Sequence, residues 1–124
     1  MSKTVLIVED SEDNMELISF IMERNGYRVL KATHGVEGVA IAIEHLPDFI
    51  ILDIQLPDID GLEVARRIRA SELDDRIPII AMTSYAMLGD REALLAAGCN
   101  GYIEKPIDVS LVMQQIRAVI GEDD

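Results

Sequence analysis

The sequence has few of the residues that define several large classes of protein. Its 124 residues include one cysteine and no tryptophan, and aromatic residues make up only 4%. The single cysteine, Cys99, excludes an intramolecular disulfide and is typical of a reducing compartment. Lysine and arginine number 11 against 23 acidic residues, which gives a formal net charge of −12. This acidity argues against a protein that binds nucleic acid or anionic membranes.

Long apolar runs are absent as well. No run approaches the ~20 residues that a membrane-spanning helix needs, and Met1 to Lys3 leads into a short apolar segment unlike a signal peptide. We therefore expect a cytoplasmic protein that binds neither nucleic acid nor membranes. The length is that of a single domain over residues 1–124, with an ordered core over about residues 3–121 and a fraying C-terminus.

Short apolar runs typical of buried strands alternate with segments whose apolar residues follow helical spacing. Strands are predicted over residues 4–8, 27–32, 49–53, 77–82 and 101–104. Helices are predicted over residues 11–25, 36–43, 62–70, 86–97 and 108–120, with Gly89 interrupting the fourth and Asp108 capping the last. This alternation predicts an α/β fold, a single doubly wound (βα)5 domain with a parallel five-stranded sheet in the flavodoxin-like order 2-1-3-4-5.

Polar side chains stand where four of these strands end. Glu9 and Asp10 follow the first strand, Asp53 ends the third, Thr83 follows the fourth and Lys105 the fifth. Parallel strands place their carboxyl ends at one edge of the sheet, so these groups should lie together. Two carboxylates ~4 Å apart repel by about 4 kcal/mol at an effective dielectric of 20, and a divalent cation would relieve this. The set suits Mg²⁺ and a phosphoryl group, whose oxygens the hydroxyl and the ammonium would contact.

Each of these residues also has a simpler interpretation. Asp53 could turn the chain after its strand, and Thr83 could cap the next helix. Lys105 could be a solvated lysine, and Tyr102 a core aromatic with its hydroxyl at the surface. The presence of all these groups at one predicted edge favours the functional interpretation.

Four motifs carry a resemblance to the receiver domain of two-component response regulators, and together they span nearly the whole chain. They are Val8-Glu9-Asp10, Leu52-Asp53-Ile54-Gln55-Leu56-Pro57 with Gly61 downstream, Met82-Thr83-Ser84, and Tyr102-Ile103-Glu104-Lys105-Pro106. Residues 86–90, with Ala97-Gly98-Cys99, are similar to stand-alone regulators of the DivK cell-cycle type and to receivers of hybrid kinases. Many family members have methionine at the position of Leu56 and aspartate at that of Glu9.

The resemblance implies a phosphoacceptor and a metal site. Asp53 corresponds to the residue that takes a phosphoryl group from a phosphohistidine on a histidine kinase or histidine phosphotransfer protein. Glu9, Asp10 and Asp53, with the main-chain carbonyl of Gln55, correspond to the ligands of Mg²⁺, for which Mn²⁺ is expected to substitute.

The resemblance also implies a switch. Lys105 corresponds to the lysine that pairs with the phosphoryl group, Thr83 to the switch hydroxyl and Tyr102 to the switch aromatic. The Lys105-Pro106 bond is expected to be cis. The face made by residues 86–97, the strand of Tyr102 and residues 108–120 is expected to bind a downstream protein. The chain would then be a signalling switch, with Mg²⁺-dependent self-phosphorylation and autodephosphorylation as its only chemistry.

The sequence leaves three alternative functions open. A degenerate receiver would act as a docking module that needs no phosphorylation. A phosphatase of the haloacid-dehalogenase type would need a second aspartate where Gln55 stands. A flavin or nucleotide carrier would need a glycine-containing phosphate loop where residues 10–13 are mostly acidic.

Overall fold

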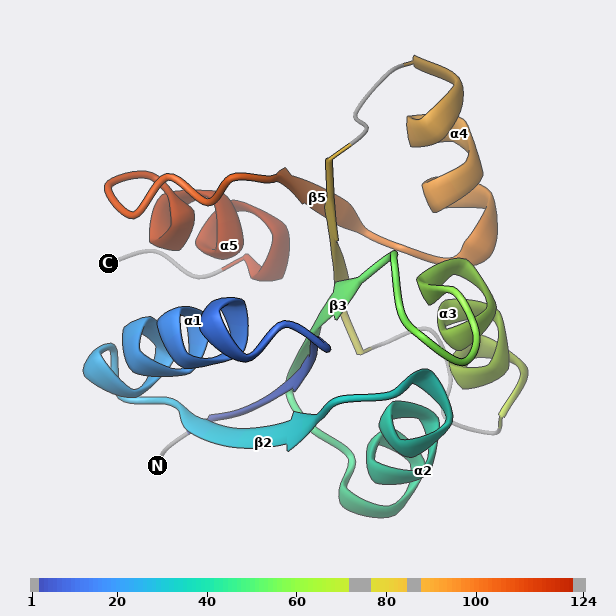
Figure 1. Cartoon of the computed structure of the whole chain (residues 1–124), viewed down its shortest axis with the longest axis horizontal. Helices are drawn as coiled ribbons and strands as arrows, with labels where there is room; N and C mark the ends of the chain where they lie inside the picture. The colour runs from blue at the N-terminus through green and yellow to red at the C-terminus, as the bar shows by residue number, and fades with distance from the viewer. Residues whose placement is uncertain (1–2, 72–76, 85–87, 122–124) are drawn as a thin grey trace.

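The computed structural model describes residues 3–71, 77–84 and 88–121, with the backbone alone at residues 88 and 89. Its strands are β1 (Thr4–Val8), β2 (Arg28–Ala32), β3 (Phe49–Asp53), β4 (Ile79–Thr83) and β5 (Gly101–Glu104). Its helices are α1 (Glu12–Arg24), α2 (Gly35–His45), α3 (Gly61–Ala70), α4 (Leu88–Ala97) and α5 (Val112–Ile120). The strands within these ranges are all parallel in the order β2-β1-β3-β4-β5, which confirms the predicted fold (Figure 1).

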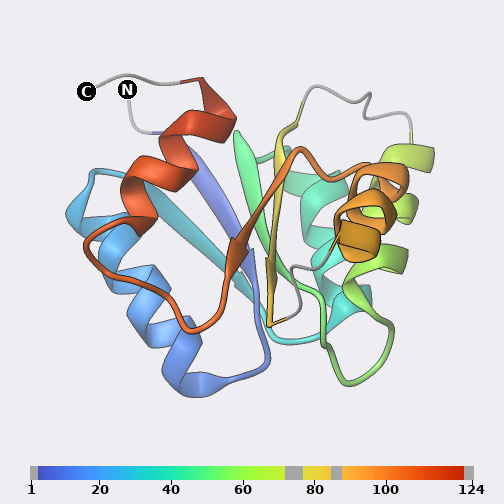
Figure 2. The ribbon, with the colours of Figure 1, turned by 90° about the horizontal axis from the view of Figure 1, so that it is seen from above.

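The sheet separates two layers of helices. Figure 2 shows α1 and α5 on one face of the sheet and α2, α3 and α4 on the other. Every residue of β3 and β4 is buried, so the alternating side chains of these strands fill both cores. Phe49 and Tyr27 pack edge to face in the α1/α5 layer, with ring centroids 5.3 Å apart. The central strands are therefore fixed by packing on both sides, and their carboxyl ends share the lower edge of Figure 2.

Several element boundaries differ from the prediction. β4 begins at Ile79 and not at Ile77, because Pro78 has no N–H to donate to a neighbouring strand. The N–H of Tyr27 donates to the carbonyl of Met22 at the end of α1, so β2 begins one residue later, at Arg28.

The predictions for the last two helices need correction. α4 continues through Gly89 without interruption, and its predicted first residues lie outside the described ranges. α5 begins at Val112 and not at Asp108. The Asp108 carboxylate accepts hydrogen bonds from the N–H of Ser110 at 3.0 Å and its hydroxyl at 2.6 Å. Asp108 therefore stabilises the turn that leads into α5, and the predicted capping of the helix by Asp108 is wrong.

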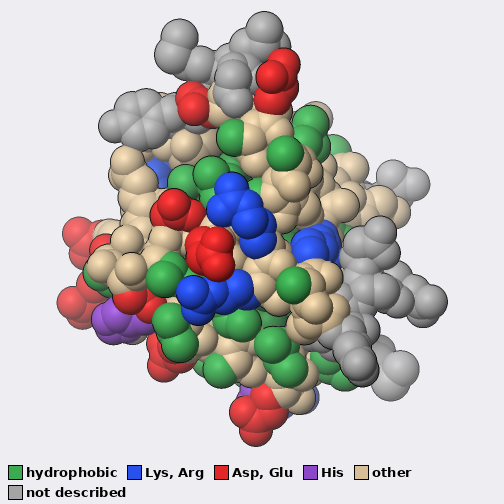
Figure 3. Space-filling model, turned by 90° about the vertical axis from the view of Figure 1, so that its right-hand side faces the viewer, with side chains coloured by type: hydrophobic (Ala, Val, Ile, Leu, Met, Phe, Trp, Pro, Cys, Tyr) green, Lys and Arg blue, Asp and Glu red, His purple; other side chains and the backbone are tan. Residues whose placement is uncertain are grey.

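The surface over the helices is mixed. The outer face of α3 presents acidic and basic side chains side by side (Figure 3). Within the described ranges, no helix has both the length and the apolar character to cross a membrane.

Candidate functional site at the carboxyl ends of the strands

The strand register brings the predicted residues to one level of the sheet. Val8 of β1 is opposite Leu52 of β3, and Asp53 is opposite Met82 of β4. The residues that follow β1, β3 and β4 therefore leave the sheet at the same edge, close to one another. There Glu9, Asp10 and Asp53 each offer a carboxylate oxygen, and these oxygens all lie within 4.8 Å of one another. The predicted acidic cluster is present in the structure.

Asp53 is buried and held from two sides. Its side chain is at the end of a strand in which all residues are buried, and the residue is only 2% exposed. The Lys105 ammonium lies 3.0 Å from Oδ1, and the N–H of Gln55 donates to the same oxygen at 3.1 Å. A carboxylate with one cation and one N–H on Oδ1 is oriented by the protein and does not turn freely.

Glu9 is the most buried acid of the cluster, with no exposed surface. Its Oε2 accepts a hydrogen bond from the N–H of Ser11 at 3.1 Å. Its Oε1 is buried and has no hydrogen-bond partner among the described residues, and the Lys105 ammonium is 3.5 Å away. Burial, followed by the neighbouring Asp53 carboxylate, raises the pKa of Glu9 to about 7.

Lys105 joins the two carboxylates to the neighbouring strands. Its side chain is 18% exposed and reaches both Glu9 and Asp53. Its N–H donates to the carbonyl of Thr83 at 2.9 Å, which ties the chain after β5 to the end of β4. The Lys105-Pro106 bond is cis, as the resemblance implied.

Of the two predicted switch residues, one lies beside this cluster and the other lies one strand further away. Thr83 ends β4, one residue beyond the partner of Asp53, and is 6% exposed. Tyr102 lies on β5 opposite Ala81 and is partly buried, with the Arg91 guanidinium 5.2 Å from the centroid of its ring. Thr83 is therefore near the acidic cluster, and Tyr102 lies on the side of β4 that faces away from it.

The loop over residues 54–60 returns closely to the end of β3. The N–H of Gly61 donates to the carbonyl of Ile54 at 2.8 Å. A Cβ at Gly61 would lie 2.5 Å from the carbonyl oxygen of Asp53, so a larger residue would push this loop away. Gly61 thus allows the loop to pack against the site.

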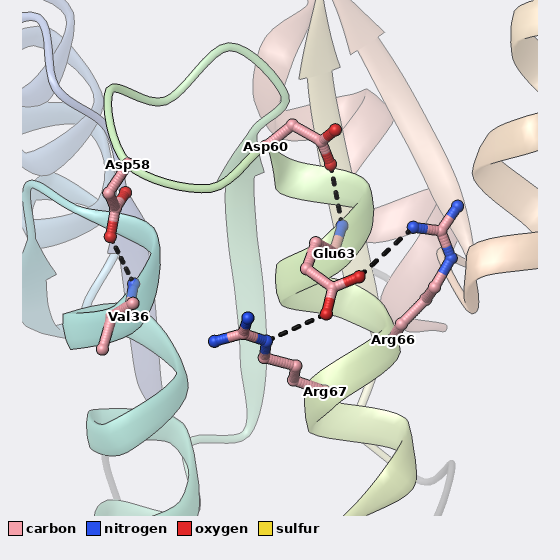
Figure 4. A network of polar contacts seen from close by, with 6 residues as sticks. All are labelled: Val36, Asp58, Asp60, Glu63, Arg66 and Arg67. Carbon is pink, nitrogen blue, oxygen red and sulfur yellow. Dashed lines mark hydrogen bonds and ion pairs between the residues drawn. The ribbon is translucent and has the colours of Figure 1, made fainter.

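Asp58 joins the loop after β3 to the start of α2, a contact that the sequence did not predict. Its carboxylate accepts hydrogen bonds from the N–H groups of the first two residues of α2, Gly35 at 2.7 Å and Val36 at 2.9 Å. Figure 4 shows the bond from Val36. These bonds hold the pKa of the Asp58 carboxyl well below its usual range. The residue before α2, His34, makes no side-chain hydrogen bond to the start of the helix, so Asp58 caps this helix from a loop more than twenty residues later. Sequence patterns predict only that Asp58 lies in a turn.

The donor set fits a hard divalent cation. Three carboxylates converge, and a buried oxygen of Glu9 has no hydrogen bond within the part of the chain that the structure describes. Mg²⁺ prefers such oxygens together with water and phosphate. Glu9, Asp10 and Asp53 are the residues that would hold it.

Comparisons with known proteins agree with this geometry. A family model of the response regulator receiver domain matches residues 5–117. The polar-differentiation response regulator DivK of Brucella ovis is 43% identical over 122 residues, which cover 98% of this chain and 99% of DivK. DivK of Brucella anthropi is 42% identical over the same length.

Two solved structures share the fold. The receiver domain of a sensor histidine kinase from Pseudomonas aeruginosa PAO1 matches with a TM-score of 0.88 and 37% identity, covering 98% of this chain and 100% of that one. Its crystal structure has a magnesium ion coordinated in the active site cleft. Chemotaxis protein CheY4 of Vibrio cholerae matches with a TM-score of 0.91 and 26% identity, covering 96% of this chain and 99% of that one.

Proposed function

Because this chain belongs to the response regulator receiver domain family, we propose that it is a two-component signalling switch whose phosphoacceptor is Asp53. The observation that carries the proposal is the environment of Asp53, a buried strand-end carboxylate with Lys105 at 3.0 Å and two further acids beside it. The donor would be a phosphohistidine on a histidine kinase or a histidine phosphotransfer protein.

The proposed reaction moves a phosphoryl group from a histidine nitrogen of the donor to a carboxylate oxygen of Asp53. An oxygen of Asp53 attacks phosphorus, the P–N bond to the phosphohistidine breaks, and the imidazole leaves with the electron pair and takes up a proton. Lys105, 3.0 Å from Asp53, would pair with the transferred group, and the Gln55 N–H would hold the attacking carboxylate in one orientation. Water that later attacks the acyl phosphate releases inorganic phosphate and restores Asp53.

We propose that Mg²⁺ is the resident ion, with Mn²⁺ able to replace it. Glu9, Asp10, Asp53 and the main-chain carbonyl of Gln55 are the proposed protein ligands. The ion would neutralise the charge of the carboxylates and the phosphoryl group. The buried Oε1 of Glu9 and the convergence of three carboxylates support this assignment.

The proposed readout is the face made by α4, β5 and α5. Thr83 would donate its hydroxyl to the phosphoryl group, and Tyr102 would move into the space that opens when the chain after Thr83 is drawn inward. A pocket of about 170 Å³ lies on this face between α4 and β5, and Arg91, Leu94 and Tyr102 are among its lining residues. A downstream protein that binds there would detect the change. The match with DivK over 99% of its length supports a regulator of the DivK type.

Two other functions fit the site less well. A docking module that needs no phosphorylation would have no use for Asp10, Asp53, Thr83 and Lys105 together at one edge of the sheet. An aspartyl-phosphate phosphatase would need an acid at position 55, where the structure has an exposed glutamine.

Mass spectrometry after incubation with acetyl phosphate tests the proposal. The native protein should gain one phosphoryl group in the presence of Mg²⁺ and little after chelation. Asp53→Asn should remain unmodified although it keeps the shape of the side chain. Asp60→Asn, a change of an exposed acid in the following loop, is the matched control and should be modified normally. Modification of Asp53→Asn at the native level would show that another residue is the acceptor.

A further inference from the structure

Helix α2 has apolar residues on its outer face as well as its inner face. Gly35, Gly38 and Ala42 are buried towards the sheet and α3. The outer residues Val36, Ala40 and Ile43 are exposed and follow the helical spacing i, i+4 and i+7. Leu46, the first residue after the helix, is exposed too, and we call these four residues the α2 stripe. Val36 is 53% exposed, Ile43 45% and Leu46 56%. In Figure 3, hydrophobic side chains over α2 are visible below the acidic and basic side chains on the outer face of α3.

The neighbouring helix α3 shows what an ordinary solvated face looks like on this protein. There the outer position Glu63 pairs with Arg66 at 3.5 Å and with Arg67 at 2.9 Å (Figure 4). Single exposed apolar residues are common on proteins, but aligned apolar residues on one helix typically mark an interaction site. The α2 stripe therefore differs from the surface beside it.

The backbone at Leu46 provides a second observation. Three other helices are followed by a residue with left-handed backbone, and in each case it is glycine: Gly26 after α1, Gly98 after α4 and Gly121 after α5. Leu46 follows α2 with a φ of 50° and is the non-glycine residue with positive φ among those described. This conformation costs free energy for a residue with a Cβ, and glycine would avoid the cost. An exposed leucine therefore stands at a position whose backbone geometry favours glycine.

The charges beside the stripe indicate what covers it. Glu37 and Glu44 lie about two helical turns apart on the same side of α2, and both are exposed. α2 contains no lysine or arginine, and the whole chain has a formal net charge of −12. A second copy of this chain would bring the same acids to the contact, so a partner with basic residues beside its apolar face is favoured.

The stripe is also held in place before a partner binds. Asp58 fixes the first turn of α2 through Gly35 and Val36. A surface that is ordered in advance loses less conformational entropy on binding.

We propose that the α2 stripe is a docking surface for an amphipathic helix of a partner protein, with an apolar face flanked by lysine or arginine. The apolar face would cover Val36, Ala40, Ile43 and Leu46, and the basic flank would lie over Glu37 and Glu44. This surface is separate from the α4-β5-α5 face and does not depend on phosphorylation of Asp53.

Titration of the isotope-labelled protein with a designed helix tests the proposal. The probe is a peptide of about 18 residues with a leucine face and a lysine flank, and its twin has glutamate in place of lysine. Amide shifts should change over residues 36–46 with the lysine peptide and much less with the glutamate peptide. Ile43→Lys should weaken binding by about tenfold or more, because it removes an apolar contact and repels the basic flank. Phe20→Lys, a change of a similarly exposed apolar residue on α1, should not.

Leu46→Gly separates docking from a structural role. It should leave the thermal midpoint unchanged or higher and weaken peptide binding, and Asp53→Asn should bind the peptide as the native protein does. The proposal is overturned if α2 amides do not shift at up to ~1 mM peptide, if both peptides bind equally, or if Phe20→Lys weakens binding as much as Ile43→Lys. It is also overturned if Leu46→Gly destabilises the fold without affecting binding. A dimer in light scattering that Ile43→Lys dissociates would identify a second copy as the occupant instead.

Discussion

At the residue scale, Glu9 is the group whose burial conflicts most with its charge. Its pKa is raised from 4.5 to about 7, mainly by burial. The folded state therefore binds more protons than the unfolded state between these two values. Linkage then requires that the free energy of unfolding falls as the pH rises through this window.

We expect the metal-free protein to lose about 1–3 kcal/mol of stability between about pH 4.5 and 7 from this residue, since one pKa unit is worth about 1.4 kcal/mol. Mg²⁺ should reduce the loss, because a cation at the site favours the ionised carboxylate. Urea unfolding over this pH range, with and without Mg²⁺, measures both effects.

Glu9→Gln is the control, because glutamine stays neutral at every pH in the window. This variant should show a flatter pH profile and a smaller gain from Mg²⁺. A native protein whose stability rises with pH across the window, in the absence of metal, would contradict the assignment of the raised pKa to Glu9.

At the element scale, α2 depends on a loop that belongs to the site. Asp58 caps α2 across the chain, whereas Asp60 caps α3 locally by accepting the N–H of Glu63 at 2.9 Å (Figure 4). We expect Asp58→Ala to lower the urea midpoint and to shift the amide resonances of Gly35 and Val36, whose N–H groups would lose their acceptor.

Asp60→Ala is the matched change in the same loop. It should shift the Glu63 amide and leave the start of α2 unchanged. If both variants perturb α2 equally, the loop rather than the Asp58 hydrogen bonds would be what supports the helix. Acidification below the usual pKa of an aspartate should perturb the two α2 amides only at unusually low pH, since the pKa of Asp58 is lowered.

The elements that could be predicted from sequence are those determined by local chemistry. The buried runs at 4–8 and 49–53 and the strand-end acids need only the burial pattern and the rule that parallel strands share an edge. The Asp58 cap joins residues more than twenty positions apart, and no periodicity reveals it. The error at Asp108 has a related cause, because a capping residue stabilises a turn as readily as a helix start.

A second contact of this long-range kind fixes the end of α4. Arg69 of α3 donates to the carbonyl of Gly98 at 2.9 Å and to Oδ1 of Asn100 at 2.8 Å. The same oxygen of Asn100 accepts the N–H of Ile79 at 2.8 Å at the start of β4. The base of α4 is therefore tied to α3 and β4, so that any adjustment of this helix would be concentrated towards its other end.

At the scale of the whole molecule, the proposed switch requires a path across the sheet from the site to the α4-β5-α5 face. Thr83 lies between Asp53 on β3 and Tyr102 on β5, and the backbone bond from Lys105 to Thr83 joins the two strand ends. Packed cores change by shifting between discrete arrangements and not by gradual deformation. A phosphoryl group should therefore alter the population of an arrangement that the protein already samples.

Thr83→Ala tests this path, because it removes the hydroxyl that would join the phosphoryl group to β4 and keeps the carboxylates and Lys105 in place. The variant should accept phosphate from acetyl phosphate yet lose most of the amide shifts that beryllium fluoride, a mimic of the bound phosphoryl group, induces at Tyr102 and along α4. Thr83→Ser, which restores a hydroxyl, should recover a large part of them. Native protein whose shifts stay at the strand ends, with Tyr102 and α4 unmoved, would place the readout elsewhere on the molecule, and an equal response in Thr83→Ala would show that the signal leaves the site by another element.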